Sequence, residues 1–120
     1  MGIDIKKEDN YISATLTGEI DYTVFLELWK EIIRACDEYK CFNILGVSDT
    51  KPMNNMDALN HEKIFKEAGV SIKHRIAWVE KNPSARAMIK FVEGVLMNRN
   101  LINGRLFADV SEAKAWLLKE

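Results

Sequence analysis

Apolar and polar residues alternate along the start of the chain. Ile3 and Ile5 are separated by polar residues, and after the turn-like segment 8–10 the alternation resumes over residues 11–17. A period of two is typical of a strand with one buried face, and a polar turn between two such stretches predicts a hairpin. The sequence therefore predicts two antiparallel strands, the second of which ends at Gly18.

Four later segments carry apolar residues every three or four positions, which is the spacing of an amphipathic helix. The second of them stops at Gly69, and Asn82 with Pro83 is a favourable opening for the third, as cap and first helical residue. Asp109 and Glu112 form a capping box before the fourth. Asp21 or Thr23 can cap the first predicted helix, whose apolar positions run from Phe25 to Tyr39. The other predicted helices cover residues 56–68, 83–99 and 110–117.

Three apolar runs lie between these helices. Residues 42–47 are nearly all apolar without alternation, which is typical of a central strand covered on both faces, and residues 76–79 and 105–107 predict two more strands. Strands that alternate with helices imply right-handed crossovers and parallel pairing in the middle of the sheet. We predict an α/β fold with a small mixed sheet and an N-terminal antiparallel hairpin, in the order β-β-α-β-α-β-α-β-α, as a single domain over residues 1–120.

Composition and charge narrow the range of partners. The chain has 17 Lys and Arg against 18 Asp and Glu, a formal net charge of −1, and 48% of its residues are apolar. A balanced charge lacks the basic face that binds phosphate backbones, so nucleic acid is not a predicted partner. The apolar runs are far shorter than the roughly 20 residues that cross a bilayer, and the charged N-terminal stretch is unlike a signal peptide, so we expect no membrane span and a cytoplasmic location.

Candidate catalytic and metal-binding groups are sparse. Cys36 and Cys41 fit no disulfide framework or metal motif, and Cys36 lies in the apolar stripe of the first predicted helix, which places it in the core. His61 and His74 belong to no recognisable triad, and both stand among charged residues, which predicts solvent exposure. Glycines are scattered singly, without a phosphate-binding loop. The sequence therefore predicts no catalytic residue, no metal and no cofactor.

The second half of the chain carries a resemblance to a known family. Residues 74–79 (His-Arg-Ile-Ala-Trp-Val), the helix over 88–96, and above all 105–109 (Arg-Leu-Phe-Ala-Asp) followed by 112–117 (Glu-Ala-Lys-Ala-Trp-Leu) resemble the SpoIIAA-like family. The resemblance implies the STAS-like fold, shared with bacterial anti-anti-sigma factors and cytoplasmic domains of anion transporters, and compared with CRAL-TRIO lipid-binding domains. It further implies a protein that binds other molecules and is not an enzyme.

One functional motif of those relatives is missing. In anti-anti-sigma factors a partner kinase phosphorylates a serine in an Asp-Ser-Ser-Gly-type motif after the central strand, which switches binding to an anti-sigma factor. Here residues 49–57 read Asp-Thr-Lys-Pro-Met-Asn-Asn-Met-Asp, with no serine. Ser48 and Thr50 carry the nearest hydroxyls, but hydroxyls in loops are more commonly turn formers than phosphate acceptors. The sequence therefore does not predict this switch.

Ligands of open α/β sheets meet the loops beyond the carboxyl ends of parallel strands, which in this chain are residues 49–55 and 80–84. The helix opening at 81–84 combines a lysine with N–H groups that attract anions, although an ordinary capped helix explains the same residues. The two methionines in the set below would add an adaptable apolar surface. The predicted binding residues are Asp49, Thr50, Met53, Asn54, Asn55, Met56, Lys81, Asn82 and Ser84.

The third predicted helix carries more apolar residues than one buried face needs. Phe91 and Val95 widen the apolar surface beyond the inner stripe. A second subunit, a lipid-like ligand or a membrane surface would cover it, and Arg86 and Lys90 would flank such a patch and meet anionic headgroups. Deeper burial beneath residues 98–104 is the other explanation.

Two functions from different classes fit these patterns. The leading hypothesis is a non-enzymatic STAS-like regulatory or protein-interaction domain that binds a protein partner through the loop after the central strand and forms a homodimer through the third helix. The alternative is a small apolar-ligand or lipid-binding carrier, with the third helix as one wall of its pocket. An enzyme is the least supported function, because no pair of acid and base is visible.

Overall fold

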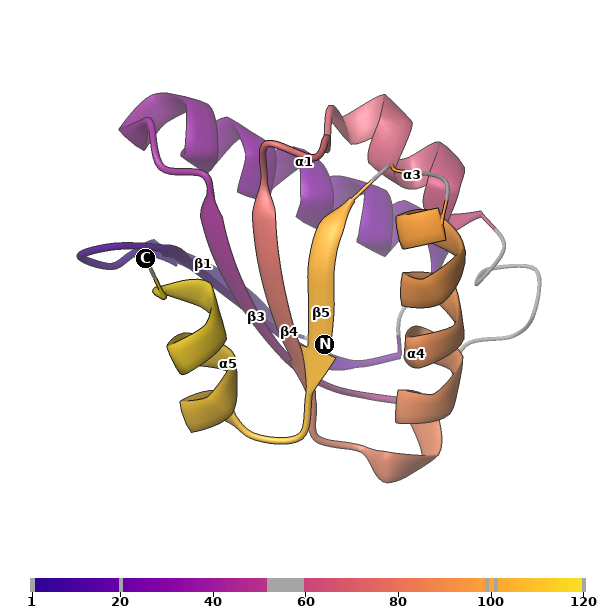
Figure 1. The fold of residues 1–120 in the computed structure, drawn as a ribbon. Coiled ribbons are helices and arrows are strands. Elements are labelled where there is room, and N and C mark those ends of the chain that lie inside the picture. The colour runs from indigo at the N-terminus through magenta and orange to yellow at the C-terminus, as the bar shows by residue number, and fades with distance from the viewer. Residues whose placement is uncertain (1, 20, 52–59, 99, 101, 120) are drawn as a thin grey trace.

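The computed structural model describes residues 2–19, 21–51, 60–98, 100 and 102–119. Within these residues the predicted order of strands and helices is confirmed (Figure 1). The elements are β1 (Gly2–Lys7), β2 (Ile12–Gly18), α1 (Tyr22–Tyr39), β3 (Asn43–Thr50), α3 (His61–Ala68), β4 (Arg75–Glu80), α4 (Pro83–Asn98), β5 (Asn103–Phe107) and α5 (Val110–Leu117).

The strands form one sheet in the order β1-β2-β3-β4-β5. The predicted hairpin is confirmed, since β1 and β2 pair antiparallel from Gly2 opposite Thr17 to Lys7 opposite Ile12. All other neighbours pair in parallel, and β3 occupies the middle of the sheet, as predicted. This topology brings the carboxyl ends of β3 and β4 to the same edge of the sheet, where a candidate binding face was predicted.

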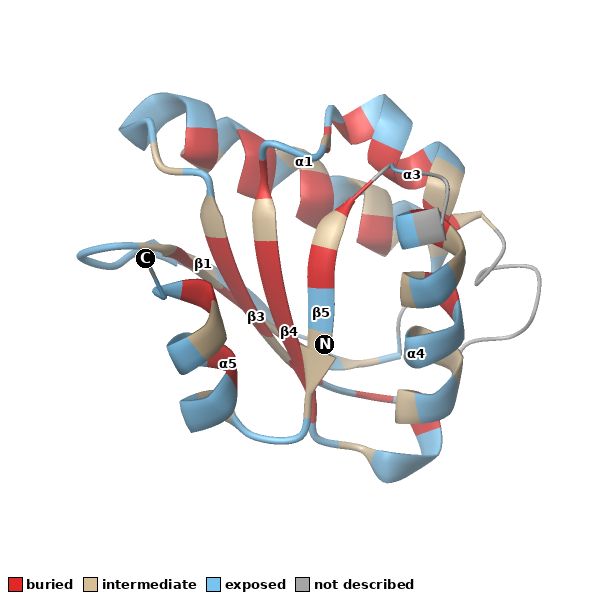
Figure 2. Cartoon of the chain, viewed as in Figure 1, coloured by how far each residue is buried: buried red, intermediate tan, exposed pale blue. Residues whose placement is uncertain are grey.

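The helices cover the two faces of the sheet unequally (Figure 1). The larger core cluster joins α1, α3 and α4 to one face, through side chains such as Trp29, Phe65 and Leu96. The smaller cluster joins α5 to the other face, where Ala113 and Leu117 pack against Leu45, Ala77 and Val79. Figure 2 shows buried residues along β3 and β4, which are the strands covered from both sides. The near-continuous apolar sequence of these strands is explained by this double cover.

Residues at the two ends of helix α1 determine where it begins and ends. The Asp21 side chain accepts a hydrogen bond from the Val24 N–H at 2.9 Å and caps the helix, and Lys40 ends it in the left-handed conformation with φ of 52°. Cys36 is fully buried, which confirms its predicted place in the core. Burial, with a smaller contribution from Cys41, raises the pKa of the Cys36 thiol to about 12. This thiol is therefore an inert core group and not a nucleophile.

Several predicted boundaries were wrong. Glu80 was assigned to the loop at 80–84, but it is the last residue of β4, which also begins one residue earlier than predicted, at Arg75. Asp49 and Thr50 were assigned to an irregular loop, but both belong to β3, because their backbones pair with Thr17 and Gly18 of β2. Strand β5 begins at Asn103, two residues before the predicted start. Four candidate binding residues and the predicted start of the second helix lie outside the described residues, namely Met53, Asn54, Asn55 and Met56.

The predicted exposure of the histidines was also wrong. His61 is 6% exposed, and its ring packs 4.8 Å from Phe25. His74 is fully buried, and its Nδ1 accepts a hydrogen bond from the Ser71 N–H at 3.1 Å. Burial, followed by the charge of Lys73, lowers the pKa of His74. Charged sequence neighbours were a poor guide because adjacent side chains can point in different directions: Lys73 is exposed, whereas the ring of His74 is buried.

Candidate functional site

A buried carboxylate organises the edge where β3 and β4 end. Glu80, the last residue of β4, is fully buried and accepts four hydrogen bonds. Its Oε1 accepts from the Ser48 hydroxyl at 2.9 Å and the Thr50 hydroxyl at 2.6 Å. Its Oε2 accepts from the backbone N–H of Asn82 at 3.0 Å and of Thr50 at 3.3 Å. Both carboxylate oxygens are therefore satisfied without any contact to solvent.

The network extends from Glu80 to a tryptophan. The Trp78 indole N–H donates to the Ser48 hydroxyl oxygen at 2.9 Å, and that hydroxyl in turn donates to Glu80. The Trp78 ring lies directly against the backbone of Gly46, its cross-strand neighbour, where an added Cβ would stand 2.0 Å from ring atom Cε3. Glycine at position 46 is what lets the indole cross β3 at this point. We call Ser48, Thr50, Trp78, Glu80 and Asn82 the Glu80 cluster.

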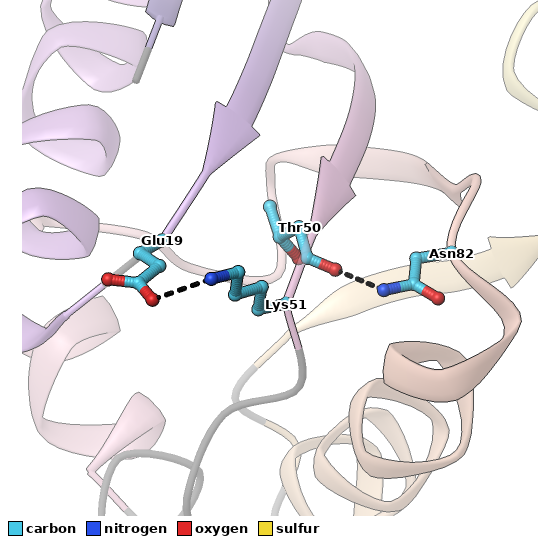
Figure 3. A network of polar contacts seen from close by, with 4 residues as sticks. All are labelled: Glu19, Thr50, Lys51 and Asn82. Carbon is cyan, nitrogen blue, oxygen red and sulfur yellow. Dashed lines mark hydrogen bonds and ion pairs between the residues drawn. The ribbon is translucent and has the colours of Figure 1, made fainter.

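The predicted binding residues that the structure describes divide into two groups. Thr50 and Asn82 come together, since the Asn82 side-chain amide donates to the Thr50 carbonyl at 2.7 Å (Figure 3), and Thr50 is buried. Asp49, Lys81 and Ser84 are exposed and lie at the same edge of the sheet. The cluster thus fixes a backbone platform that carries a polar surface.

The opening of α4 is an ordinary capped helix start. Asn82 Oδ1 accepts the Ser84 N–H at 3.0 Å, as predicted for a cap residue followed by Pro83. Arg86 turns back and donates twice to the Glu80 carbonyl oxygen, at 3.2 Å from Nε and 2.9 Å from Nη2. The Ser84 N–H in the first turn and the Arg86 side chain are therefore both paired with groups of the same chain.

A surface ion pair joins two loops beside this edge. Lys51 Nζ lies 2.8 Å from Glu19 Oε1, and Figure 3 shows the two side chains pointing toward each other. Hydrogen bonding and charge attraction lower the pKa of Glu19 and raise that of Lys51. Both side chains are exposed, so the pair contributes little to the stability of the fold.

The second candidate region is a cavity of about 70 Å³ beneath α4. Aromatic rings form part of its wall, with Trp29 at 4.7 Å from Phe65 and 5.5 Å from Trp78 between ring centres. Arg105 is exposed and also lines the cavity, so the cavity reaches the surface. The described lining residues are Phe25, Trp29, His61, Phe65, Ile76, Trp78, Ile89, Val92, Glu93, Leu96, Ile102, Gly104, Arg105 and Leu106.

The polar groups of this cavity are mostly engaged. Glu93 accepts the Leu106 N–H at 3.2 Å with Oε1, and its Oε2 lies 2.9 Å from Lys90 Nζ. The buried Trp29 Nε1 has no hydrogen-bond partner among the described residues. Lys90, which was predicted to flank a lipid-facing patch, is thus tied to a carboxylate on its own helix.

The outer face of α4 keeps its apolar residues in solvent. Phe91 is 56% exposed and Met97 is 47% exposed, and Val95 is half-buried. Burial within the domain therefore does not account for Phe91 and Met97. Nothing in the described residues covers this face.

The described residues contain neither a metal-binding cluster nor a membrane-spanning helix. Within the ranges that the structure describes, no group of three or more His, Cys, Asp or Glu residues is placed to hold a metal ion. In those ranges no helix is long and apolar enough to cross a bilayer. The absence of a metal and of a cofactor stays a prediction.

Sequence reasoning missed Glu80, Ser48 and Trp78 as parts of one site. Glu80 follows an apolar strand and precedes a lysine, a position that is typical of an exposed strand end. One signal was present in the sequence. Ser48 and Thr50 are two positions apart in a strand, so their side chains share one face of β3 and present two hydroxyls to the neighbouring strand.

Comparison with known proteins shows the fold. Neither a family model nor a curated protein matches the chain. Among solved structures, an anti-sigma factor antagonist from Mycobacterium paratuberculosis is similar with a TM-score of 0.64 and 13% identity, over 97% of this chain and 92% of that chain. A DUF3478 family protein with a SpoIIAA-like fold from Shewanella loihica PV-4 gives a TM-score of 0.58 and 16% identity, over the same shares. The chain has the SpoIIAA-like fold that its sequence predicted.

Proposed function

We propose that the protein is a non-enzymatic, cytoplasmic regulatory domain that binds a protein partner at the edge formed by the Glu80 cluster. The observation that carries this proposal is a platform in which a fully buried carboxylate holds the end of β3 and the start of α4 together. A surface fixed before binding loses less conformational entropy when a partner docks. The similar fold of an anti-sigma factor antagonist supports a function in protein recognition.

The proposed domain works without the phosphoserine switch. Residues 49–57 contain no serine, and Ser48 is 3% exposed with its hydroxyl committed to Glu80. The Thr50 hydroxyl is buried in the same way and donates to Glu80 at 2.6 Å. A kinase would have to break the Glu80 cluster to reach either group, so partner binding in this protein is controlled by other means.

Site-specific photo-crosslinking in the native host tests the proposed surface. A photo-reactive amino acid at Lys81, an exposed residue of the edge, should give a discrete partner adduct that mass spectrometry identifies. The matched control is Lys40, an exposed lysine at the carboxyl end of α1 and away from the Glu80 cluster. Equal adducts at both positions, or none at Lys81, would contradict the proposed surface.

The cavity beneath α4 supports a second candidate function, the binding of a small, neutral, apolar molecule. Its wall is aromatic and aliphatic, and its one described carboxylate, Glu93, already has a hydrogen bond and an ion pair. The one cation of the described lining, Arg105, is exposed at the open side, so the charge of a fatty acid or another anionic lipid would be disfavoured in the buried part of the cavity beside Glu93. About 70 Å³ is well below the roughly 150 Å³ of an engineered cavity that holds benzene. The occupant is therefore a small molecule, or one end of a larger one.

Native mass spectrometry of the purified protein tests this second function. The expected result is a bound neutral species that disappears in Leu96→Phe, which fills space from the α4 wall of the cavity. The exposed substitution Leu118→Phe is the control and should leave the bound mass in place. An empty wild-type protein would count against a carrier.

A further inference from the structure

Trp78 belongs to both candidate regions at once. Its ring is part of the cavity wall, and its indole N–H is the first donor of the Glu80 cluster. The chain of contacts then runs from Ser48 to Glu80 and ends at the Thr50 and Asn82 backbones. We infer that a small neutral molecule in the cavity acts on the partner-binding edge through Trp78 and Ser48. This inference rests on the second proposed function, since it needs an occupied cavity.

The placement of Trp78 makes it a suitable relay. The six-membered ring lies directly against the Gly46 backbone, so the indole cannot move toward β3 without a clash. On the cavity side it faces Trp29, with 5.5 Å between ring centres. An occupant that presses on the indole therefore displaces it along β3 and not toward it. Ser48 is itself part of β3, so this displacement changes the distance between Nε1 and the Ser48 hydroxyl.

Ser48 passes the change on because its hydroxyl has one proton. It accepts from Trp78 and donates that proton to Glu80 Oε1, so its two contacts strengthen or weaken together. Glu80 then has no solvent contact that could compensate, since the residue is fully buried. The remaining donors to the carboxylate, at Thr50 and Asn82, must adjust.

These changes in hydrogen bonding reach the edge that is proposed to bind the protein partner. The Asn82 backbone N–H and the Thr50 carbonyl, which accepts the Asn82 side chain, sit where β3 ends and α4 begins. Exposed Asp49 and Lys81 are their chain neighbours. Cavity occupancy would therefore control the partner surface, in place of the phosphoserine switch that this chain lacks. By linkage, a bound partner would change the affinity of the cavity by the same factor.

Xenon is the sharpest probe of this coupling, because it is neutral, apolar and unable to form the hydrogen bonds of the edge. Two-dimensional NMR spectra are recorded under xenon and under nitrogen at equal pressure. We expect the methyl signals of Ile76 and Leu96 in the cavity wall to shift, together with the backbone amides of Thr50 and Asn82. The indole of Trp116, which packs on the opposite face of the sheet, should not move.

Two variants separate the relay from the cavity. In Ser48→Ala and Trp78→Phe the methyl shifts should persist while the xenon response of the Thr50 and Asn82 amides is lost. Either variant suffices if the other fails to fold. The exposed substitution Ser111→Ala in α5 is the control and should respond as wild type.

The outcomes distinguish this inference from the function on which it rests. Methyl shifts without amide shifts in the wild type, or amide shifts that survive in both variants, would overturn the relay while the cavity stays a binding site. If xenon moves neither set of signals, the cavity function fails and the relay fails with it.

Discussion

The edge at the Glu80 cluster and the cavity beneath α4 lie on either side of Trp78 and are built in opposite ways. In the Glu80 cluster both carboxylate oxygens, two hydroxyls and the indole N–H are all paired. In the cavity about 70 Å³ is unfilled, and the buried Trp29 N–H has no partner among the described residues. Saturated polar networks rigidify a fold, whereas an unfilled apolar space can admit an occupant. The comparison indicates where the molecule holds its shape and where it can respond.

The largest expected effect comes from removing the carboxylate. Glu80→Ala leaves buried donors from Ser48, Thr50 and Asn82 without an acceptor, which should lower the free energy of unfolding by about 3–5 kcal/mol. Urea denaturation measures this change in the free energy of unfolding. Glu31→Ala, at an exposed site in α1, is the control and should change stability by less than about 0.5 kcal/mol. Similar losses in both variants would contradict the role of the cluster.

Two glycines give effects of opposite sign. Gly46→Ala forces a Cβ to within 2.0 Å of the Trp78 ring and should cost about 2–3 kcal/mol, with a change in the Trp78 indole signal. Gly94→Ala in α4 meets nothing within 4 Å and should stabilise the protein by about 0.5–1 kcal/mol through helix propensity. Thermal unfolding of the two variants gives both values. If Gly46→Ala left the stability unchanged, the Trp78 indole would have to occupy another position in the variant.

The buried His74 should make the stability of the protein depend on pH, with a smaller effect than the substitutions above. Its pKa is lowered in the fold, chiefly by burial, below the unfolded value of about 6.5. Its contribution is therefore complete above about pH 6.5 and is lost as the pH falls below that value toward the folded pKa. Urea midpoints at about pH 7.5 and 5 should fall further in wild type than in His74→Gln. An equal fall would assign the acid sensitivity to other groups.

The smallest effect on stability is expected at the outer face of α4. Phe91→Glu replaces a side chain that is 56% exposed and should change the free energy of unfolding by about 0.5 kcal/mol or less. If Phe91 and Val95 form the predicted homodimer contact, the same variant should shift the protein to monomer in light scattering. Unchanged mass would leave the two regions joined by Trp78 as the candidates for function.

The parts of this fold that could be predicted are those set by near neighbours in sequence. Alternation along residues 11–17 predicted β2, and Asp109 caps α5 through the Glu112 N–H at 2.8 Å, as its spacing indicated. Local patterns also predicted that Asn82 opens α4. Capping and periodicity act over a few residues, so one sequence carries them in full.

The candidate site depends on contacts that sequence order hides. Glu80 is buried because Ser48 and Thr50, about thirty positions earlier, bring donors to it. The apolar excess of the third predicted helix suggested one wall of a pocket, but the other walls come from α1, α3, β4 and β5, which sequence order does not bring together. His61 and His74 were misjudged for the same reason, since their burial is set by rings such as Phe25 and Phe42 from distant elements.

Hydrogen exchange at three backbone amides tests most directly whether the Glu80 cluster holds the edge rigid. Thr50 and Asn82 donate to the Glu80 carboxylate, and Lys81 donates to the Ser48 carbonyl at 2.8 Å. If the Glu80 cluster holds the edge, all three amides exchange as slowly as Ile44 in the core, and Glu80→Gln accelerates exchange at Thr50 and Asn82 selectively. Fast exchange of these amides in the wild type, at the rate of exposed turns, would contradict it.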